Sequence, residues 1–510
     1  MLSSKKINMK NIIYKGVLAL FALAMVVSCD EGFEDLNEDP TKASQIDVKF
    51  KFPNTVLFAS GQRYETWRGN LIYCSTMMQH LANTQGYWSG DKYFWNAAYS
   101  SAFWDAMYPQ AVKTVEDMKF QLETEELTSS PEYAMVRILR VFIYHRLTDL
   151  YGDIPYSEAG KAFIEGNTRP KYDAQEDIYA DMLKELEESV ALLGTGTAEI
   201  GTSDILFLGN QDQWKKWGNS LMLRLALRLV KVDETAAQAW ATKAINGGVM
   251  ESNADIAYVQ HEDGNGILQN ANGEVFTADR SARISTTFLG LLENDPRMRV
   301  YAALPPDEDT GFVNDDPAAQ KGLPNGLDGT TIQDYEGGDD LATYSEPNSK
   351  YLMSEAAPMF WQTYAEVELM LAEAGVRWGL AGDPAAHYEA GVTAAMEYLE
   401  MYNAGAAIDA SEIADYLAAN PFDAANALEQ INTEYYKATF LNEYETYANW
   451  RRTGFPNLTP VNYPGNQTNG TIPRRLIYPT NEQALNKENY DAVIASQGAD
   501  LLTTRVWWDQ

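Results

Sequence analysis

Amphipathic helical patterns recur along most of this 510-residue chain and constrain its fold more than any other feature. In residues 171–193, apolar side chains return every three or four positions, as one face of a helix requires. These side chains are Ile178, Met182, Leu186, Val190 and Leu193. Residues 213–231, 359–379 and 382–402 show the same pattern, and a further helix is expected near 425–450. The recurrence predicts an all-α fold.

Two of these helices carry start signals. Asp173 and Glu176 have the spacing of a capping box, in which two side chains satisfy the free N–H groups of the first turn. Asp383 is a suitable N-cap, and Pro384 suits the first helical position because its missing N–H is not needed there. We therefore expect helices to begin at these two places.

The helices are joined by short Gly/Asp turns and are rich in alanine and large aromatic residues, which resembles tetratricopeptide-type helix pairs packed into an α-α superhelix. No exact repeat period is visible. Residues 251–357 and 453–480 are instead rich in Gly, Asn, Asp and Pro, and we expect long irregular excursions there. No Gly/Ser or Pro-rich linker divides the chain, so residues 41–510 are interpreted as a single domain.

The N-terminus has the form of a secretory signal peptide over residues 1–28. Four lysines precede the apolar run 16–27, which is too short for a bilayer span. The following "VVSC" resembles the lipobox of bacterial lipoproteins, with Val26 where Leu is common. Cys29 is therefore the expected lipidation site, and two or more acyl chains would anchor the protein stably. The alternative is an unmodified cysteine.

Six acidic residues follow Cys29 within residues 29–40, and like charges this close favour an extended tether. The segment also resembles the surface-export signal of Bacteroidetes lipoproteins. In enteric bacteria, however, an Asp directly after the cysteine favours retention in the inner membrane, so both addresses remain open.

The net charge of −33 argues against nucleic acid as a partner, because its phosphates would be repelled. Neutral ligands or a basic partner surface suit the chain better. If Cys29 carries lipid, Cys74 is the one remaining cysteine, which leaves no pair for a disulfide. Its apolar surroundings predict a small buried side chain.

Eight motifs then follow in a recognisable order along the chain. They are "LTDLYGDIPYSEA" (147–159), "PKYDAQEDIYADMLKELEES" (170–189), "WKKWGNSLMLRLALR" (214–228), "ENDPR" (293–297), "AEVELMLAEA" (365–374), "NWRRTGFPNL" (449–458), "IPRRLIYPTNE" (472–482) and "RVWWD" (505–509). Their order, spacing and content resemble the SusD/RagB family of Bacteroidetes outer-membrane lipoproteins, over essentially the whole mature chain.

The resemblance implies four tetratricopeptide-like helix pairs and a loop-rich face. It also implies an outer-membrane protein, held by its lipid and facing the cell exterior, that serves as the lid of a SusC-like TonB-dependent barrel. Such a lid captures oligosaccharides, or in some members peptides, and delivers them to the barrel without cutting them. The motifs "WRR" (450–452) and "RVWWD" are expected to be structural.

Candidate ligand residues must combine aromatic rings for a sugar face with polar groups for its hydroxyls. The main candidates lie in the aromatic stretch 86–109 and just before it, where Gly86 and Gly90 predict a loop. They are Trp88, Tyr87, Asn83 and Gln85, with Trp67 and Arg63 nearby in sequence and Tyr335 and Tyr344 in the long central loop. Trp95, Tyr99 and Phe103 have helical spacing and are expected in the core.

Enzyme signatures are absent from the sequence. A glycoside hydrolase needs two placed carboxylates, but 72 acidic residues allow any pair to be nominated, so this alternative gains no support. The four histidines form no H-E-x-x-H pair and are interpreted as structural or exposed. No cofactor or metal ligand is expected. Structural Ca²⁺ held by 261–266 or 307–316 is the alternative to solvated loops, although neither segment fits an EF-hand.

Overall fold

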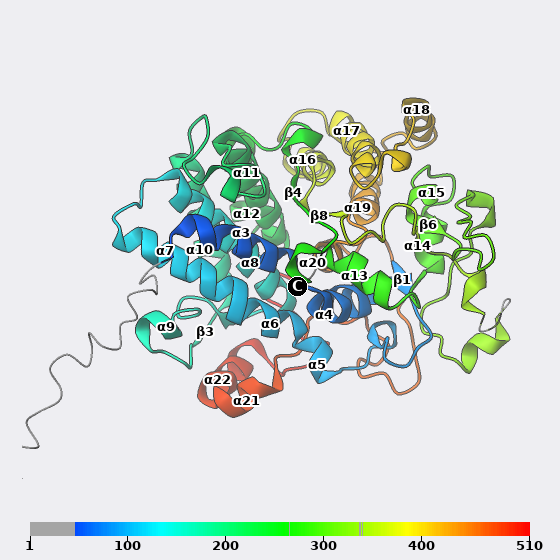
Figure 1. Ribbon diagram of the computed structural model, residues 1–510, viewed down its shortest axis with the longest axis horizontal. Helices are drawn as coiled ribbons and strands as arrows, with labels where there is room; N and C mark the ends of the chain where they lie inside the picture. Colours follow the sequence, from blue (N-terminus) through cyan, green and yellow to red (C-terminus); the bar gives the residue numbers. More distant parts are fainter. Residues whose placement is uncertain (1–45, 265, 336–337, 339) are drawn as a thin grey trace, which may run out of the picture. The chain divides into compact units, whose positions relative to one another are not determined.

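The computed structural model describes residues 46–264, 266–335, 338 and 340–510 (Figure 1). The expected signal peptide, Cys29 and the acidic tether lie outside the described residues. Contacts within the chain separate Met1–Asp47 from Val48–Gln510, and the described helices and strands belong to the second unit. Within the described residues, no helix combines the length and apolar character that a membrane span requires.

Helices dominate this unit, as the recurring amphipathic pattern predicts. The longer ones have eight or more residues and are α3 (Val48–Ser60), α7 (Lys113–Thr124), α8 (Pro131–Tyr151), α10 (Gln175–Leu192), α11 (Gln211–Arg228), α12 (Glu234–Gly247), α13 (Ala271–Ala278), α16 (Tyr364–Trp378), α17 (Pro384–Glu397), α18 (Ala410–Ala419), α19 (Ala427–Ala438), α20 (Glu443–Thr453) and α22 (Lys487–Gln497). The shorter ones are α4 (Arg63–Glu65), α5 (Ala97–Ser100), α6 (Ala102–Met107), α9 (Ala162–Glu165), α14 (Thr286–Leu291), α15 (Met298–Tyr301) and α21 (Thr480–Leu485), with π-helical turns at η1 (Thr66–Ser75) and η3 (Tyr108–Val112).

Strands are short, and in the described residues they pair antiparallel, two at a time. The pairs are β1 (Leu81–Ala82) with β5 (Arg283–Ile284), β2 (Ile154–Pro155) with β3 (Tyr172–Asp173), β4 (Ala257–Gln260) with β8 (Pro358–Gln362), and β6 (Ala302–Ala303) with β7 (Glu346–Pro347). Each pair joins segments that are distant in the chain or flank a loop. They pin the irregular regions to the helices.

Long helices that follow one another in the chain pack as neighbours, and the expected all-α fold of tetratricopeptide-like helix pairs is confirmed. The successive packed pairs are α8 with α10, α10 with α11, α11 with α12, and α16 with α17. Helix α16 packs on α11 and also on α19, so it joins α17 and α19 to the helices α8, α10, α11 and α12. In Figure 1, α8, α10, α11 and α12 lie together, whereas β1, β6, α14 and α15 lie among loops on the other side of α20.

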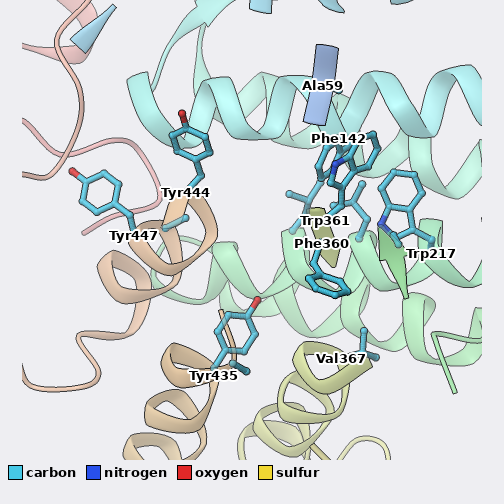
Figure 2. Packing of buried hydrophobic residues seen from close by; sticks show 14 of the residues in the cluster. Ala59, Phe142, Trp217, Phe360, Trp361, Val367, Tyr435, Tyr444 and Tyr447 are labelled. Atoms are coloured by element: carbon cyan, nitrogen blue, oxygen red, sulfur yellow. The ribbon is translucent and has the colours of Figure 1, made fainter. Parts of the chain in front are cut away.

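Large aromatic residues fill the core where the helix pairs meet (Figure 2). The ring of Trp361 stacks on Phe142 with 4.1 Å between centroids and 14° between planes, and Trp217 packs beside both. Cys74 is fully buried as expected, and burial raises the pKa of its thiol. The motif residues Arg451, Arg452 and Trp508 are also buried, in keeping with a structural role.

Of the two helix starts predicted from capping signals, one is confirmed and one is wrong. Asp383 accepts a hydrogen bond from Ala385 N, and Pro384 opens α17, both as expected. The expected capping box at Asp173 is wrong. Asp173 belongs to β3 and its carboxylate accepts hydrogen bonds from the N–H groups of Tyr156 and Ser157, so α10 begins after Ala174 without a side-chain cap.

Two other expectations on helices need correction. The helix expected from residue 359 begins at Tyr364, because residues 358–362 pair with β4 and a capping box of Thr363 and Glu366 then opens α16. The helix expected near 425–450 is two helices, α19 and α20, separated at Leu441, whose φ of 71° lies in the left-handed region.

The regions expected to be irregular contain short ordered elements. The described residues of 251–357 hold α13, α14, α15, four strands and several 3₁₀ turns among their loops. These turns include η7 (Gly266–Leu268), η8 (Pro317–Ala319), η9 (Thr331–Asp334) and η10 (Leu341–Thr343). Residues 453–480, all of them described, add no further strand, and helix is confined to their two ends, where α20 finishes and α21 begins.

Candidate functional site

A pocket of about 620 Å³ lies among the loops around β5, and we call it the Tyr335 pocket. Its lining includes Gln79, Thr287, Lys321, Asn325, Tyr335 and Asn462. Tyr335 is 47% exposed, so its ring is open to a ligand. Tyr344 also lines the pocket but is fully buried, with the Lys321 ammonium 4.9 Å from its ring centroid. Both tyrosines were candidates from sequence, and the structure brings them together.

Three chain segments form the floor of the pocket, and backbone hydrogen bonds join them. Ser285 N donates to His80 O, and Thr286 N donates to Leu323 O, each at 3.0 Å. Gly322 allows this close approach, because a Cβ atom there would lie 2.5 Å from the Cα of Thr286. Backbone pairing fixes the floor and leaves the side chain of Thr287 on the lining.

Gln79 joins the floor to the opposite wall. Its Nε2 donates to Thr459 O at 2.7 Å, and its Oε1 accepts from the Thr287 hydroxyl at 2.8 Å. Its φ of 58° turns the chain out of the preceding helical segment and toward the pocket. Gln79 was not among the candidates from sequence, because "STMMQHLA" has the pattern of a continuous apolar helix.

A buried ion pair outside the lining holds the loops of the pocket together. Lys92 Nζ donates to Asp91 Oδ1 at 3.0 Å and to the carbonyls of Asn83 and Trp88 at 2.9 and 3.1 Å. The second oxygen of Asp91 accepts from Gly326 N at 3.0 Å. The Asp91–Lys92 pair therefore connects the loop after β1 to the segment that carries Asn325.

The remaining candidates from sequence gather at a second place, around Tyr87. This ring is 40% exposed and meets Trp67 edge to face, with centroids 6.1 Å apart. Its hydroxyl donates to Asp279 Oδ2 at 3.0 Å, and burial is the main reason that its pKa is raised. Gln85 is exposed and Arg63 half-buried, so both remain accessible beside this pair.

Two candidates from sequence do not offer their side chains to solvent. Trp88 is fully buried, and its indole N–H donates to Asp279 Oδ2 at 3.0 Å, so the expectation that its ring stacks on a ligand is corrected. Asn83 is also buried and its amide donates to the hydroxyl of Ser281 at 2.8 Å. Both side chains position the 279–281 segment.

Of the three aromatic residues at 95–103 that were expected in the core, two belong to it and one does not. Phe103 is buried, and Tyr99 is half-buried and packs against the core. Trp95 is 37% exposed, so its core assignment is wrong. The reason is local, because Trp95 precedes α5, which begins only at Ala97 after the Asn96 cap.

The described lining of the Tyr335 pocket is mostly uncharged. Lys321 is the one charged side chain among the described lining residues, and it lies over the Tyr344 ring. Amides, hydroxyls and carbonyls supply the other polar groups, from Gln79, Thr287 and Asn462 among others. Such groups donate and accept hydrogen bonds without charge, as a sugar's hydroxyls require.

A family model described as "Starch-binding associating with outer membrane" matches residues 48–479. The chain belongs to the SusD-like family. This SusD-like chain is 32% identical to a structurally solved chitin-binding protein, with a TM-score of 0.81 over 91% of this chain and 100% of that one. It is 28% identical to a solved SusD-like protein of Bacteroidetes, with a TM-score of 0.80 and the same coverage.

A chitin-binding SusD homologue from Flavobacterium johnsoniae shares the fold at 23% identity, with a TM-score of 0.75 over 91% of this chain and 98% of that one. A comparison with curated proteins found no match.

Each segment considered for Ca²⁺ contains a side chain that bonds within this SusD-like chain. Asp307 Oδ1 accepts from the N–H groups of Asp309 and Thr310 at 3.2 and 2.9 Å and so closes its own turn. His261 bonds to Leu268 O and to the Ser60 hydroxyl, each at 3.0 Å. No group of three or more His, Cys, Asp or Glu side chains is placed to hold a metal ion in the described residues.

Proposed function

We propose that this protein captures oligosaccharides at the cell surface and passes them to a SusC-like TonB-dependent outer-membrane transporter, without cutting them. The Tyr335 pocket carries the proposal. It is a cavity of about 620 Å³ with an exposed aromatic ring and uncharged polar groups, in a chain that belongs to a family described as starch-binding.

The chemistry of the pocket supports a neutral sugar as ligand. The Tyr335 ring offers an apolar face for the C–H groups of a pyranose, and the Thr287 hydroxyl and the Asn462 amide flank it with donors and acceptors. Its volume lies within the range typical of small-ligand sites. The relatives named as chitin-binding suggest N-acetylated sugars as one class to examine, beside the glucans of the family description.

Binding without hydrolysis is supported by the composition of the lining. A glycoside hydrolase places two carboxylates about 5–10 Å apart on either side of the scissile bond. None of the described residues that line the Tyr335 pocket is acidic. The buried Ser60–His261 contact lacks a carboxylate partner, because the other ring nitrogen of His261 bonds to a backbone carbonyl.

The membrane attachment and the partner belong to the same proposal. Lipidation of Cys29 would hold the body at the outer membrane, and the acidic segment 29–40 would act as its tether. Delivery to a TonB-dependent barrel follows from the resemblance to the SusD/RagB family.

The test is calorimetric titration of the purified full-length protein, kept in detergent, with neutral oligosaccharides and with peptides. Each mixture is then examined for cleavage products by chromatography. Saturable binding of one glycan class with no new product supports the proposal. Binding of peptides alone would keep the architecture and change the cargo, whereas release of shorter sugars would show a glycoside hydrolase.

The partner is tested separately, by co-purification. A tagged copy of the protein is purified from its native membrane after solubilisation. One large TonB-dependent barrel should purify with it. A protein that purifies alone under mild detergent would contradict the delivery step while leaving glycan binding in place.

A further inference from the structure

A second groove, of about 480 Å³, lies where α4 and η1 meet α5 and α6, and it shares no lining residue with the Tyr335 pocket. We call it the Arg68 groove. Its sides carry Tyr64, Arg68, Asp105 and Gln110, and none of the residues expected from the sequence to bind ligand lines it. The volume is again that of a small-ligand site.

The guanidinium of Arg68 is held in place without using its hydrogen-bond donors. It lies 5.2 Å from the ring centroid of Tyr64 and 5.8 Å from that of Tyr99, within the range of cation–π attraction. Arg68 forms no hydrogen bond and no ion pair with any described residue. Its planar set of N–H donors is therefore oriented by the two rings and free to bind a ligand.

Acceptors and amides face the same groove. Asp105 accepts the Ser101 hydroxyl at 2.7 Å through Oδ2, and its Oδ1 accepts nothing from the described residues. The side-chain amide of Gln110 likewise has no partner among them. Adjacent sugar hydroxyls need such a mixture, because each hydroxyl both donates and accepts.

Part of the floor of the groove is apolar. The small side chains of Ala98, Ala102 and Ala106 line it, from α5 and α6, and the 57% exposed ring of Tyr64 forms part of the rim. A pyranose ring can lie on such a floor with its C–H groups down and its hydroxyls toward the rim. Bulkier side chains at these three positions would fill the space.

We propose that the Arg68 groove is a second carbohydrate-binding site, which takes a neutral sugar unit. The groove is lined by one cationic side chain, Arg68, and two carboxyl side chains, Glu65 and Asp105, and the chain's net charge of −33 disfavours acidic polysaccharides. A chain long enough to occupy both sites binds more tightly than a short one, because the second contact is intramolecular. The inference rests on the proposed function, since it assigns a second site to the same class of ligand.

The test compares polymer and hexasaccharide binding for Arg68→Ala, Arg68→Lys and Asp105→Asn. The probes are soluble starch and glycol chitin, with maltohexaose and chitohexaose as short ligands. One of the two polymers is expected to bind the wild-type protein, and the affinity of each variant for that polymer should be about tenfold lower. The affinity of each variant for the hexasaccharide, which binds at the Tyr335 pocket, should stay within about twofold of wild type. Arg169→Ala, an exposed arginine without side-chain bonds, is the matched control, and thermal melting confirms folding.

The possible outcomes separate the second site from the proposed function. Unchanged polymer affinity in all three variants overturns the second site and leaves the proposed function intact. A wild-type protein that binds none of the four probes refutes the second site for glucan and chitin chains, and failure across the wider glycan panel refutes the proposed function itself.

A second measurement isolates the groove. In a Tyr335→Ala background, where the Tyr335 pocket is weakened about fivefold, adding Arg68→Ala should lower the polymer affinity by a further factor of about ten. A double variant that binds the polymer as tightly as Tyr335→Ala alone would overturn the inference.

Discussion

The helix pairs around α11 and the loops around the Tyr335 pocket are held together by different interactions. Between the helices, buried charges join separate elements. Arg224 of α11 contacts Glu366 of α16 at 2.6 Å, and Arg228 contacts Glu445 of α20 at 2.7 Å, with all four side chains at most 3% exposed. At the pocket, backbone groups and uncharged side chains make most of the contacts.

This difference indicates that stability and ligand binding depend on different parts of the molecule. A buried charge is costly unless paired, so each pair in the helical region fixes the distance between two helices. Burial alone would raise the pKa of Glu445, but Arg224 and Arg228 outweigh it and hold that pKa at about 2. The pocket, in contrast, leaves hydroxyls, amides and Tyr335 available to a ligand on a floor already fixed by the backbone.

The largest effect is expected from Glu445→Gln. This change leaves Arg224 and Arg228 buried with too little negative charge, which should lower the free energy of unfolding by about 3–5 kcal/mol. Denaturant titration followed by circular dichroism measures it. The matched control is Glu187→Gln, which breaks the exposed contact with Lys243 and should cost at most about 1 kcal/mol. Equal losses in the two variants would show that burial of the pairs is unimportant.

Lys92→Met should lower both the stability of the protein and its affinity for ligand. It removes the cation beside the buried Asp91 carboxylate, so we expect a loss of about 3 kcal/mol in stability. Affinity for oligosaccharide should also fall, although Lys92 does not line the Tyr335 pocket, because Asp91 anchors Gly326. Lys184→Met, at a lysine that is 67% exposed, should change neither property. Full affinity in Lys92→Met would contradict the coupling through Asp91.

Tyr335→Ala should separate the two properties. The exposed ring contributes little to folding, so stability should change by about 0.5 kcal/mol or less. Oligosaccharide affinity should fall roughly fivefold, which corresponds to about 1 kcal/mol, by calorimetric titration. Phe312→Ala removes an exposed ring outside the pocket and is the control. A variant that binds as tightly as wild type would exclude Tyr335 from the contact surface.

The smallest effect is a dependence on pH at the α16–α17 contact. The hydrogen bond from His387 to Glu368, at 2.6 Å, is the main reason that the pKa of His387 is raised. A raised pKa adds stability below the ordinary histidine value, about 6.5, and that stability is lost as pH rises through the raised pKa. His387→Gln should therefore cost up to about 1 kcal/mol near pH 5.5 and almost nothing near pH 8.5.

Other titrating groups do not obscure this prediction. Burial lowers the pKa values of His145 and His261, so these two destabilise the fold as pH falls, but they do so equally in both proteins. The difference between wild type and His387→Gln in denaturant titrations isolates the one contact. A difference that does not change with pH would contradict the assignment.

The helical fold could be predicted because its signal is periodic and local. The stripe in residues 171–193 became α10, and the cap at Asp383 with Pro384 became the start of α17. Helix ends decided by distant partners were not visible. Residues 358–362 form β8 because β4, a hundred residues earlier in the chain, offers backbone partners.

The site could be predicted only in part. Aromatic residues in loops pointed to Tyr87 and Tyr335, which are exposed. The flanking glycines misled at Trp88, because Gly90 serves close packing rather than an open loop: a Cβ atom there would lie 2.1 Å from Ile72 O. Arg68 and Gln79 gave no signal, since their roles depend on Tyr99 and Thr287, which lie far along the chain.

The most direct test of capture at the Tyr335 pocket is a crystal structure of the protein with the oligosaccharide that binds most tightly in titration. We expect a sugar ring against the exposed face of Tyr335, with its hydroxyls bonded to Thr287 and Asn462. A sugar bound elsewhere, with the Tyr335 pocket empty at saturating ligand, would contradict the claim that this pocket is the primary site of capture.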